Sequence, residues 1–163
     1  MRIAVCDDDR AIREELFRLI QKQVSEVDIV GYQSGEELIN AKGNFDIYFL
    51  DIEMGKVSGM DIARRIRERE ENGRQRSIII FVTGYREYME AAFDVNAFHY
   101  LVKPIDAEKF LEVFSRAWKE VSVSCEQTKK YIMVKSSGMQ QKLFLKDIYY
   151  IESGNKKVIF HTT

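Results

Sequence analysis

The sequence is poor in the residues that define several protein classes. It has only two cysteines, Cys6 and Cys125, too few for a disulfide framework, and no CxxC pair or Cys/His cluster typical of zinc sites. Cys6 lies in an apolar run, so we expect it to be a buried small hydrophobe. No apolar run approaches the ~18 residues needed to cross a bilayer, and the N-terminus lacks a signal-peptide pattern. We therefore expect a cytoplasmic protein that does not bind membranes.

Proline is rarer still. Pro104 is the only proline among 163 residues, and it directly follows Lys103. A single proline at this position indicates control of the loop that carries the lysine, and X–Pro is the bond type that tolerates cis geometry. We predict a cis Lys103–Pro104 peptide.

The whole chain has no large excess of positive or negative charge, but each of its two parts does. Hydrophobic residues make up 45% and charged residues 31% of the chain, which is ordinary for a globular protein and argues against disorder. Residues 1–128 hold 18 Lys and Arg against 24 Asp and Glu, whereas residues 129–163 hold 7 against 2. This division indicates two units with different partners. Charge alone leaves open whether the basic tail meets an anion such as nucleic acid or is a solvated strand surface.

The first two thirds of the chain alternate short apolar runs with amphipathic stretches. The runs predict strands over residues 2–6, 27–32, 45–50, 78–82 and 98–102, and the stretches predict helices over residues 11–24, 34–39, 59–71, 85–93 and 107–121. Ser34 is the expected N-cap of the second helix, with Glu37 completing a capping box. Five strand–helix repeats predict a parallel sheet covered by helices on both faces, complete within residues 1–121.

The remaining sequence has a different pattern. Residues 122–130 are expected to be a helix end that leads into a linker. Beyond them, short apolar runs separated by turn residues predict an all-β segment over residues 131–163.

Polar residues follow four of the five predicted strands. They are Asp7, Asp8 and Asp9 after the first strand, Asp51 after the third, Thr83 after the fourth and Lys103 after the fifth. Each one alone is more often a cap or a solvated rim residue. Because the carboxyl ends of parallel strands meet at one edge, where such folds bind ligands, the set together predicts a functional site.

The residue types indicate phosphoryl chemistry. Clustered carboxylates repel one another unless a cation joins them, and oxygen ligands of this kind suit Mg²⁺. Asp51 is then placed to attack phosphorus and form an aspartyl phosphate. Lys103 and Thr83 would stabilise the charge on the transferred phosphoryl oxygens.

Four segments, VCDDD, LDIEMGKVSG, FVTG and YLVKP, resemble the signature segments of response-regulator receiver domains. The resemblance covers residues 1–121 and implies a flavodoxin-like (βα)5 doubly wound sheet of strand order 2-1-3-4-5. It implies that Asp51 is the phospho-acceptor and that Asp7 and Asp8 are the acidic pair, with Asp8 contacting Mg²⁺ directly and Asp7 through water.

The resemblance also assigns three further roles. The backbone carbonyl of Glu53 is the remaining protein ligand of Mg²⁺, and Thr83 and Tyr100 are the pair that switches on phosphorylation. One position departs from the family pattern, because Gly55 stands where the family usually has proline. The glycine loosens the loop after Asp51.

The tail resembles the start of a LytTR-type DNA-binding domain, through LKDIYYIES, a basic loop and VIFHT. By this resemblance, residues 154–157 form one DNA-facing loop. The segment offers only the first part of such a domain, so we expect the chain to be a piece of a longer protein.

Together the two resemblances imply a response regulator of a two-component system, in which a sensor histidine kinase phosphorylates Asp51 in a Mg²⁺-dependent reaction. Phosphorylation would favour a homodimer and switch a DNA-binding, transcription-regulating output. The chain would not be an enzyme beyond its own phosphorylation and slow dephosphorylation. Two alternatives stay open: a Mg²⁺-dependent phosphohydrolase of the haloacid-dehalogenase type with Asp7 as nucleophile, and a receiver that acts only as a protein-binding module.

Overall fold

The computed structural model describes residues 1–70, 76–85, 87–129, 131–136, 139–154 and 157–162. Among these residues, no helix is both long enough and apolar enough to cross a membrane. The chain divides into two compact units, Met1–Val121 and Ser122–Thr163.

The first unit is built on a parallel five-stranded sheet of order β2-β1-β3-β4-β5, as predicted. Its strands are β1 (Arg2–Cys6), β2 (Asp28–Tyr32), β3 (Ile47–Leu50), β4 (Ile78–Thr83) and β5 (His99–Val102). All residues of β3 and β4 are buried, because helices cover both faces of the sheet at its centre.

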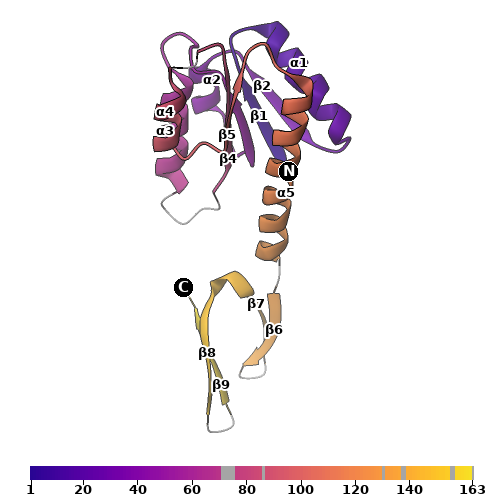
Figure 1. The fold of residues 1–163 in the computed structure, drawn as a ribbon. Helices are drawn as coiled ribbons and strands as arrows, with labels where there is room; N and C mark the ends of the chain where they lie inside the picture. The colour runs from indigo at the N-terminus through magenta and orange to yellow at the C-terminus, as the bar shows by residue number, and fades with distance from the viewer. Residues whose placement is uncertain (71–75, 86, 130, 137–138, 155–156, 163) are drawn as a thin grey trace. The chain divides into compact units, whose positions relative to one another are not determined.

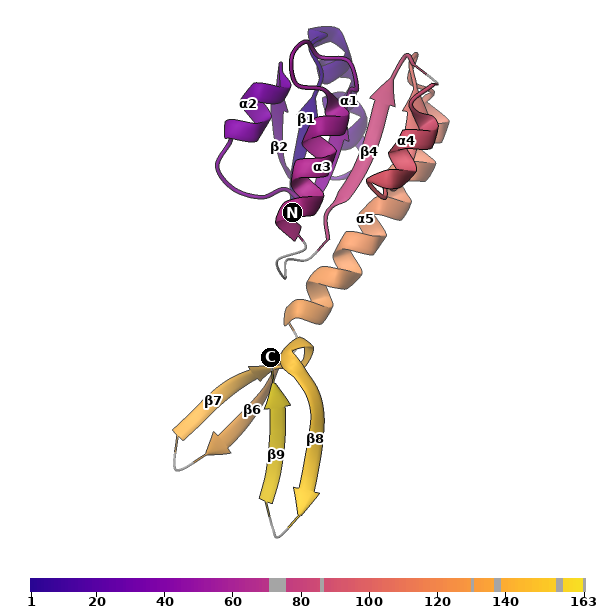
Figure 2. The ribbon, with the colours of Figure 1, turned by 90° about the vertical axis from the view of Figure 1, so that its left-hand side faces the viewer.

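Helices lie on both faces of this sheet. They are α1 (Arg10–Gln23), α2 (Gly35–Asn40), α3 (Gly59–Glu70), α4 (Met89–Asp94) and α5 (Ala107–Lys129). Figure 1 shows α1 and α5 on one face, and Figure 2 shows α2, α3 and α4 in front of the other. The flavodoxin-like doubly wound fold is therefore confirmed.

Alternate residues of each strand enter different halves of the core. On the α1 and α5 face, the ring of Phe49 stacks on Phe110 with centroids 5.6 Å apart, and Phe110 stacks on Phe114 at 5.7 Å. All three rings are at most 1% exposed. Burial of such a side chain is worth roughly 2–3 kcal/mol, so these layers anchor the helices to the sheet.

The predicted start of α2 is confirmed, whereas the predicted start of α4 is wrong. Ser34 caps α2 as predicted, because its Oγ accepts a hydrogen bond from the backbone N–H of Glu37 at 3.3 Å. The Glu37 carboxylate reaches back to the N–H of Gln33 at 3.0 Å, one residue before the position of a standard capping box. The fourth helix was expected from Tyr85, but α4 begins only at Met89, and its N-cap Tyr88 makes no side-chain capping bond.

The second unit holds the end of α5 and two antiparallel hairpins. One pairs β6 (Tyr131–Ser136) with β7 (Met139–Phe144), and the other pairs β8 (Ile148–Gly154) with β9 (Lys157–Thr162), with a short 3₁₀ helix, η1 (Leu145–Asp147), between the hairpins. The expected all-β character of this segment is confirmed.

The expected linker is wrong over most of its length, because α5 continues to Lys129. Val121 is still buried, while Val123 is 47% exposed. Residue 130 of the expected linker lies outside the described residues, as do residue 71 of the third predicted helix and residues 155–156 of the expected DNA-facing loop.

Candidate functional site

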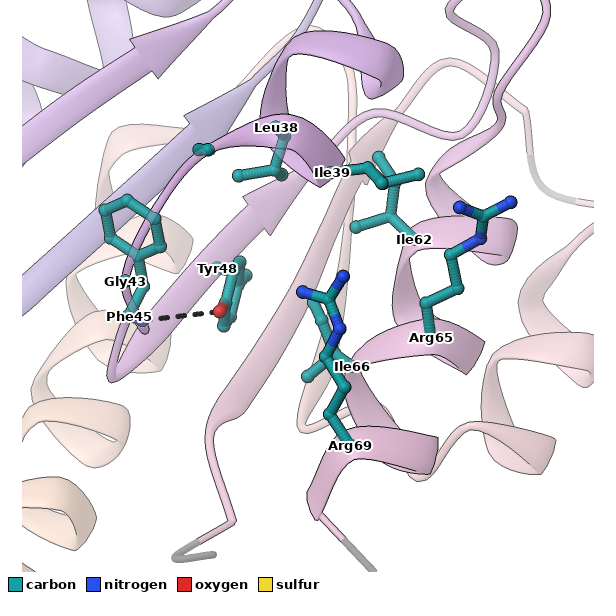
Figure 3. Close-up of a pocket in the computed structure, with 10 residues that line it drawn as sticks. Leu38, Ile39, Gly43, Phe45, Tyr48, Ile62, Arg65, Ile66 and Arg69 are labelled. Atoms are coloured by element: carbon teal, nitrogen blue, oxygen red, sulfur yellow. Dashed lines mark hydrogen bonds between the residues drawn. The ribbon is translucent and has the colours of Figure 1, made fainter.

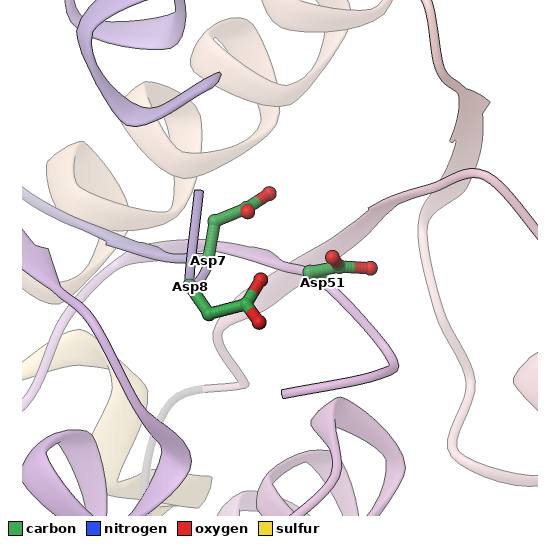
Figure 4. Close-up of side chains that lie close together, drawn as sticks. All are labelled: Asp7, Asp8 and Asp51. Atoms are coloured by element: carbon green, nitrogen blue, oxygen red, sulfur yellow. The ribbon is translucent and has the colours of Figure 1, made fainter. Parts of the chain in front are cut away.

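Three carboxylates meet at the carboxyl edge of the sheet. Asp7 and Asp8 follow β1, and Asp51 follows β3, which pairs directly with β1. One carboxylate oxygen from each lies within 4.8 Å of the others, and Figure 4 shows the three side chains close together. Asp7 is 1% exposed and Asp51 6% exposed, whereas Asp8 is exposed.

The ammonium group of Lys103 bridges the two buried carboxylates. Its Nζ lies 2.7 Å from Oδ2 of Asp51 and 2.8 Å from Oδ2 of Asp7. Lys103 follows β5, which lies beside β4. The Lys103 N–H donates to the Thr83 carbonyl at 2.9 Å and so joins the ends of these two strands. The Lys103–Pro104 peptide is cis, as predicted.

Burial and ion pairing have opposite effects on the pKa values of Asp7 and Lys103. Burial raises the pKa of Asp7, while the Lys103 ammonium and the Asp9 N–H oppose that rise. Burial lowers the pKa of Lys103, but the carboxylates of Asp51 and Asp7 outweigh it, so the pKa of Lys103 stands above its ordinary value. Lys103 therefore stays protonated beside carboxylates that it does not fully neutralise.

The donor set fits a hard divalent cation. Oδ2 of Asp7 is buried and, among the described residues, has no hydrogen-bond partner, so its approach to Nζ is an ion pair without hydrogen-bond geometry. Three carboxylates lie together, and the Lys103 ammonium group pairs with two of them, Asp7 and Asp51. Oxygen ligands with an excess of negative charge are those that Mg²⁺ prefers.

The structure places Thr83 and Tyr100 on the neighbouring strands β4 and β5. Thr83 is fully buried, and its Oγ1 accepts a hydrogen bond from the Tyr85 N–H at 3.4 Å. The half-buried Tyr100 donates its hydroxyl to the carbonyl of Tyr85. Burial, together with the charges of Glu87 and Asp51, raises the pKa of Tyr100 to about 12, so this hydroxyl remains a donor at neutral pH.

Two residues at this edge were missed by reasoning from the sequence. Gly59 begins α3, and a Cβ there would lie 2.1 Å from the Asp51 carbonyl oxygen, so only glycine allows α3 to approach the acceptor. Tyr88 donates its hydroxyl to the Glu53 carboxylate at 3.3 Å. Hydrophobic patterns do not predict which stretches of backbone approach one another, so they do not reveal the Gly59 contact. The glycine itself stands in the LDIEMGKVSG segment.

A hollow lies between α2, β3 and α3, away from the three carboxylates. Figure 3 shows Leu38, Ile62 and Ile66 in its wall, with Arg65 and Arg69 beside them. The Phe45 N–H donates to the Tyr48 hydroxyl at 3.3 Å within this wall. None of Asp7, Asp8 and Asp51 lines it, so it is separate from the acidic site.

Comparison with known families identifies the first unit. Residues 3–115 match the family described as the response regulator receiver domain. The chain therefore belongs to the response regulator receiver domain family. This membership decides for the receiver against the phosphohydrolase alternative.

Relatives extend the similarity beyond the first unit. The chain is 34% identical over 124 residues to the sensory transduction protein LytT of Oceanobacillus iheyensis, an alignment that covers 75% of this chain and 50% of that protein. It is 32% identical over 163 residues to the transcriptional regulatory protein BtsR of Escherichia coli K12, covering 94% of this chain and 66% of that protein. The second alignment takes in the β hairpins, which is consistent with the LytTR resemblance. The chain thus spans half to two thirds of the length of these relatives.

A solved structure shows the same similarity in three dimensions. The response regulator TrrA of Thermotoga maritima, crystallised with Mg²⁺ and BeF, is 31% identical with a TM-score of 0.62. The superposition covers 71% of this chain and 97% of that one. The first unit therefore corresponds to nearly all of that protein.

Proposed function

We propose that the chain is the phospho-accepting part of a two-component response regulator, and that Asp51 receives the phosphoryl group. The observation that carries this proposal is the bridge of Lys103 between Asp51 and Asp7, at 2.7 and 2.8 Å, beside the exposed carboxylate of Asp8. Family membership supports it.

The reaction uses a carboxylate oxygen of Asp51 as the nucleophile. With a phosphohistidine of a sensor histidine kinase as donor, the new P–O bond forms while the P–N bond breaks, and the imidazole nitrogen keeps the electron pair and takes a proton. The Ile52 N–H holds Oδ1 of Asp51 at 2.7 Å, which fixes the plane of the carboxylate before attack.

Lys103 and Thr83 act on the transferred group. Lys103 shifts its ammonium contacts from Oδ2 of Asp51 to a phosphoryl oxygen, and the Thr83 hydroxyl donates to another. The loss of the Thr83 bond to the Tyr85 N–H is coupled to Tyr100, because Tyr100 bonds the carbonyl of the same residue. This pair is our proposed switch.

Asp7, Asp8, Asp51 and the backbone carbonyl of Glu53 would hold Mg²⁺. The ion supplies neutralisation of the charge that develops on the phosphoryl oxygens. The crystallised TrrA complex with Mg²⁺ and BeF supports this assignment. The chemistry of the chain is then limited to its own phosphorylation and the slow loss of the phosphoryl group.

The output would be a phosphorylation-dependent homodimer that regulates transcription through a complete LytTR-type domain. Phe93 on α4 is 75% exposed and Met89 is 42% exposed, which offers an apolar surface for such a dimer. The name of BtsR as a transcriptional regulatory protein supports the output. We expect DNA binding by this chain itself to be weak and to fall steeply with salt, since phosphate contacts would supply most of it.

The test of the acceptor is intact-protein mass spectrometry after incubation with Mg²⁺ and a small-molecule acyl phosphate, with Asp51→Asn alongside. We expect the parent chain to gain one phosphoryl group and Asp51→Asn to gain none. No gain in the parent, or an equal gain in both proteins, would remove Asp51 as the acceptor.

A further inference from the structure

Arg13 lies in the first turn of α1, and its side chain folds back onto the connection between β1 and α1. Its Nη1 donates to the backbone carbonyl of Asp7 at 2.6 Å and to that of Asp8 at 3.2 Å. One guanidinium group thus holds two consecutive peptide units, and their side chains are two of the proposed metal ligands. Hydrogen bonds from a charged donor are roughly twice as strong as neutral ones.

The surroundings of Arg13 favour this conformation. The side chain is half-buried, and its Cδ lies 3.8 Å from the position that a Cβ would take at Gly31 of β2. The ring of Phe17, one turn along α1, lies 2.9 Å from the same position. Since Gly31 has no side chain, the stem of Arg13 can pass close to the sheet and reach the carbonyls.

We propose that Arg13 is a positioning residue for the metal site, a role that rests on the proposed function. By fixing the peptide units of Asp7 and Asp8, it restricts the directions in which the two carboxylates extend. Groups that orient metal ligands from behind are typically worth 10–100-fold in metal affinity. Arg13 itself contacts neither the metal nor the phosphoryl group.

When Arg13 is replaced, an effect of its charge and an effect of its positioning change the affinity for Mg²⁺ in opposite directions. Loss of a positive charge near a cation site strengthens cation binding if charge is all that matters. Loss of the two hydrogen bonds weakens it, because the carboxylates must then be ordered by the ion. Arg10 provides a matched control, since it lies on the same helix and its side chain is exposed and pairs with Glu14 at 2.7 Å.

The experiment is a Mg²⁺ titration of the whole chain, followed by the amide signals of the acidic edge in NMR spectra. We expect Arg13→Ala to raise the Kd for Mg²⁺ by about tenfold, Arg13→Lys to raise it less, and Arg10→Ala to leave it unchanged or lower. Arg13→Lys keeps the charge and carries the test if Arg13→Ala does not fold.

Thermal unfolding with a chelator separates positioning from a structural role. If Arg13 only supports the fold, its variants lower the midpoint while their Kd for Mg²⁺ equals that of the parent, and the inference is overturned. It is also overturned if both Arg13 variants bind as tightly as the parent or more tightly. Absence of Mg²⁺ binding by the parent chain would overturn the metal site of the proposed function, and this inference with it.

Discussion

At the scale of single residues, three adjacent aspartates take three different tasks. The Asp9 carboxylate caps α1 by accepting the Ala11 N–H at 2.8 Å. Asp7 turns into the protein toward Lys103, and Asp8 remains exposed beside Asp51. Because successive side chains at a strand end point in different directions, identical neighbours enter different environments.

The first prediction concerns the cost of burying Asp7. Burial raises the pKa of this carboxyl group, so its charged form is held at a cost at neutral pH. Asp7→Asn removes the charge, and its amide oxygen can still accept the Asp9 N–H that Oδ1 of Asp7 accepts at 2.9 Å. In a chelator, we expect the thermal midpoint of Asp7→Asn at pH 7 to rise by roughly 2–4 °C, which corresponds to about 1 kcal/mol.

The exposed neighbour supplies the control. Asp8→Asn removes an equal charge from a solvated side chain, so its chelator midpoint should stay close to that of the parent. Mg²⁺ should raise the midpoint of the parent and of neither variant, because only the parent keeps the full ligand set. A lower chelator midpoint for Asp7→Asn would mean that the ion pair with Lys103 outweighs the burial cost.

The second prediction concerns the close approach of α3 to the acceptor. In Gly59→Ala the new Cβ would stand 2.1 Å from the carbonyl oxygen and 2.9 Å from the carbonyl carbon of Asp51, both of them backbone atoms. We expect a loss of about 1–3 kcal/mol in the free energy of unfolding, as for an overpacked core. Urea denaturation measures it, and Gly84→Ala, whose Cβ meets nothing within 4 Å, should change it far less. Equal losses for the two variants would rule out the steric explanation.

At the scale of elements, one arginine joins α3 to the residue before β4 and to the connection between α4 and β5. Arg67 donates to the carbonyls of Val95 at 2.8 Å, Ser77 at 2.9 Å and Asn96 at 3.1 Å. Its side chain is only 12% exposed and also pairs with Glu70 at 2.7 Å. Asn96 has a φ of 47°, so this arginine also holds the carbonyl of a residue in the left-handed region.

The third prediction follows from this junction. Arg67→Ala leaves three carbonyls and the Glu70 carboxylate without their charged donor, and we expect a loss of about 3 kcal/mol or more in the free energy of unfolding. Urea denaturation provides the measurement. Arg64→Ala on the same helix removes an exposed arginine whose pair with Asp61 spans 3.4 Å, and it should cost roughly 0.5 kcal/mol or less. A loss for Arg67→Ala as small as that of the control would show that water replaces these contacts.

The elements also show where sequence patterns fail. The positions of the strands and their polar ends were predictable, because apolar runs and polar ends follow from burial in a parallel sheet. The strand order was implied only by the resemblance to receiver domains. The start of α4 was not, since Tyr85 and Tyr88 continue the apolar pattern but the helix starts at Met89 without a side-chain cap. The end of α5 was misplaced because small polar residues such as Ser122 are common in linkers yet compatible with a helix.

At the scale of the whole molecule, the meeting of the three carboxylates with Lys103 was predictable, because these residues follow the ends of three parallel strands. Asp51, Thr83 and Lys103 needed only the rule that parallel strands end at one edge. The residues behind the site were not predictable, since the Arg13 and Gly59 contacts depend on the distance between a helix and a backbone carbonyl. The sequence predicts which groups meet, whereas the packing determines how they are held.

The fourth prediction concerns the independence of the two units. Among the residues whose burial the structure describes, the buried core of the first unit extends to Val121, which is 4% exposed, while Val123 is 47% exposed. The contacts of Lys103 and Asp51 lie within Met1–Val121, the first compact unit. We therefore expect a fragment of residues 1–123 to fold and to bind Mg²⁺ with the Kd of the whole chain.

Its thermal midpoint should lie within roughly 2 °C of the first-unit transition in the whole chain, equivalent to about 0.5 kcal/mol. Such agreement would mean that the β hairpins contribute little to the stability of the receiver, so phosphorylation must reach any output by changing a surface of the first unit. A fragment that binds Mg²⁺ more weakly, or unfolds at a much lower temperature, would instead show that the residues after 123 support the acidic edge. The coupling between the acidic edge and the residues after 123 would then already exist in the unphosphorylated chain.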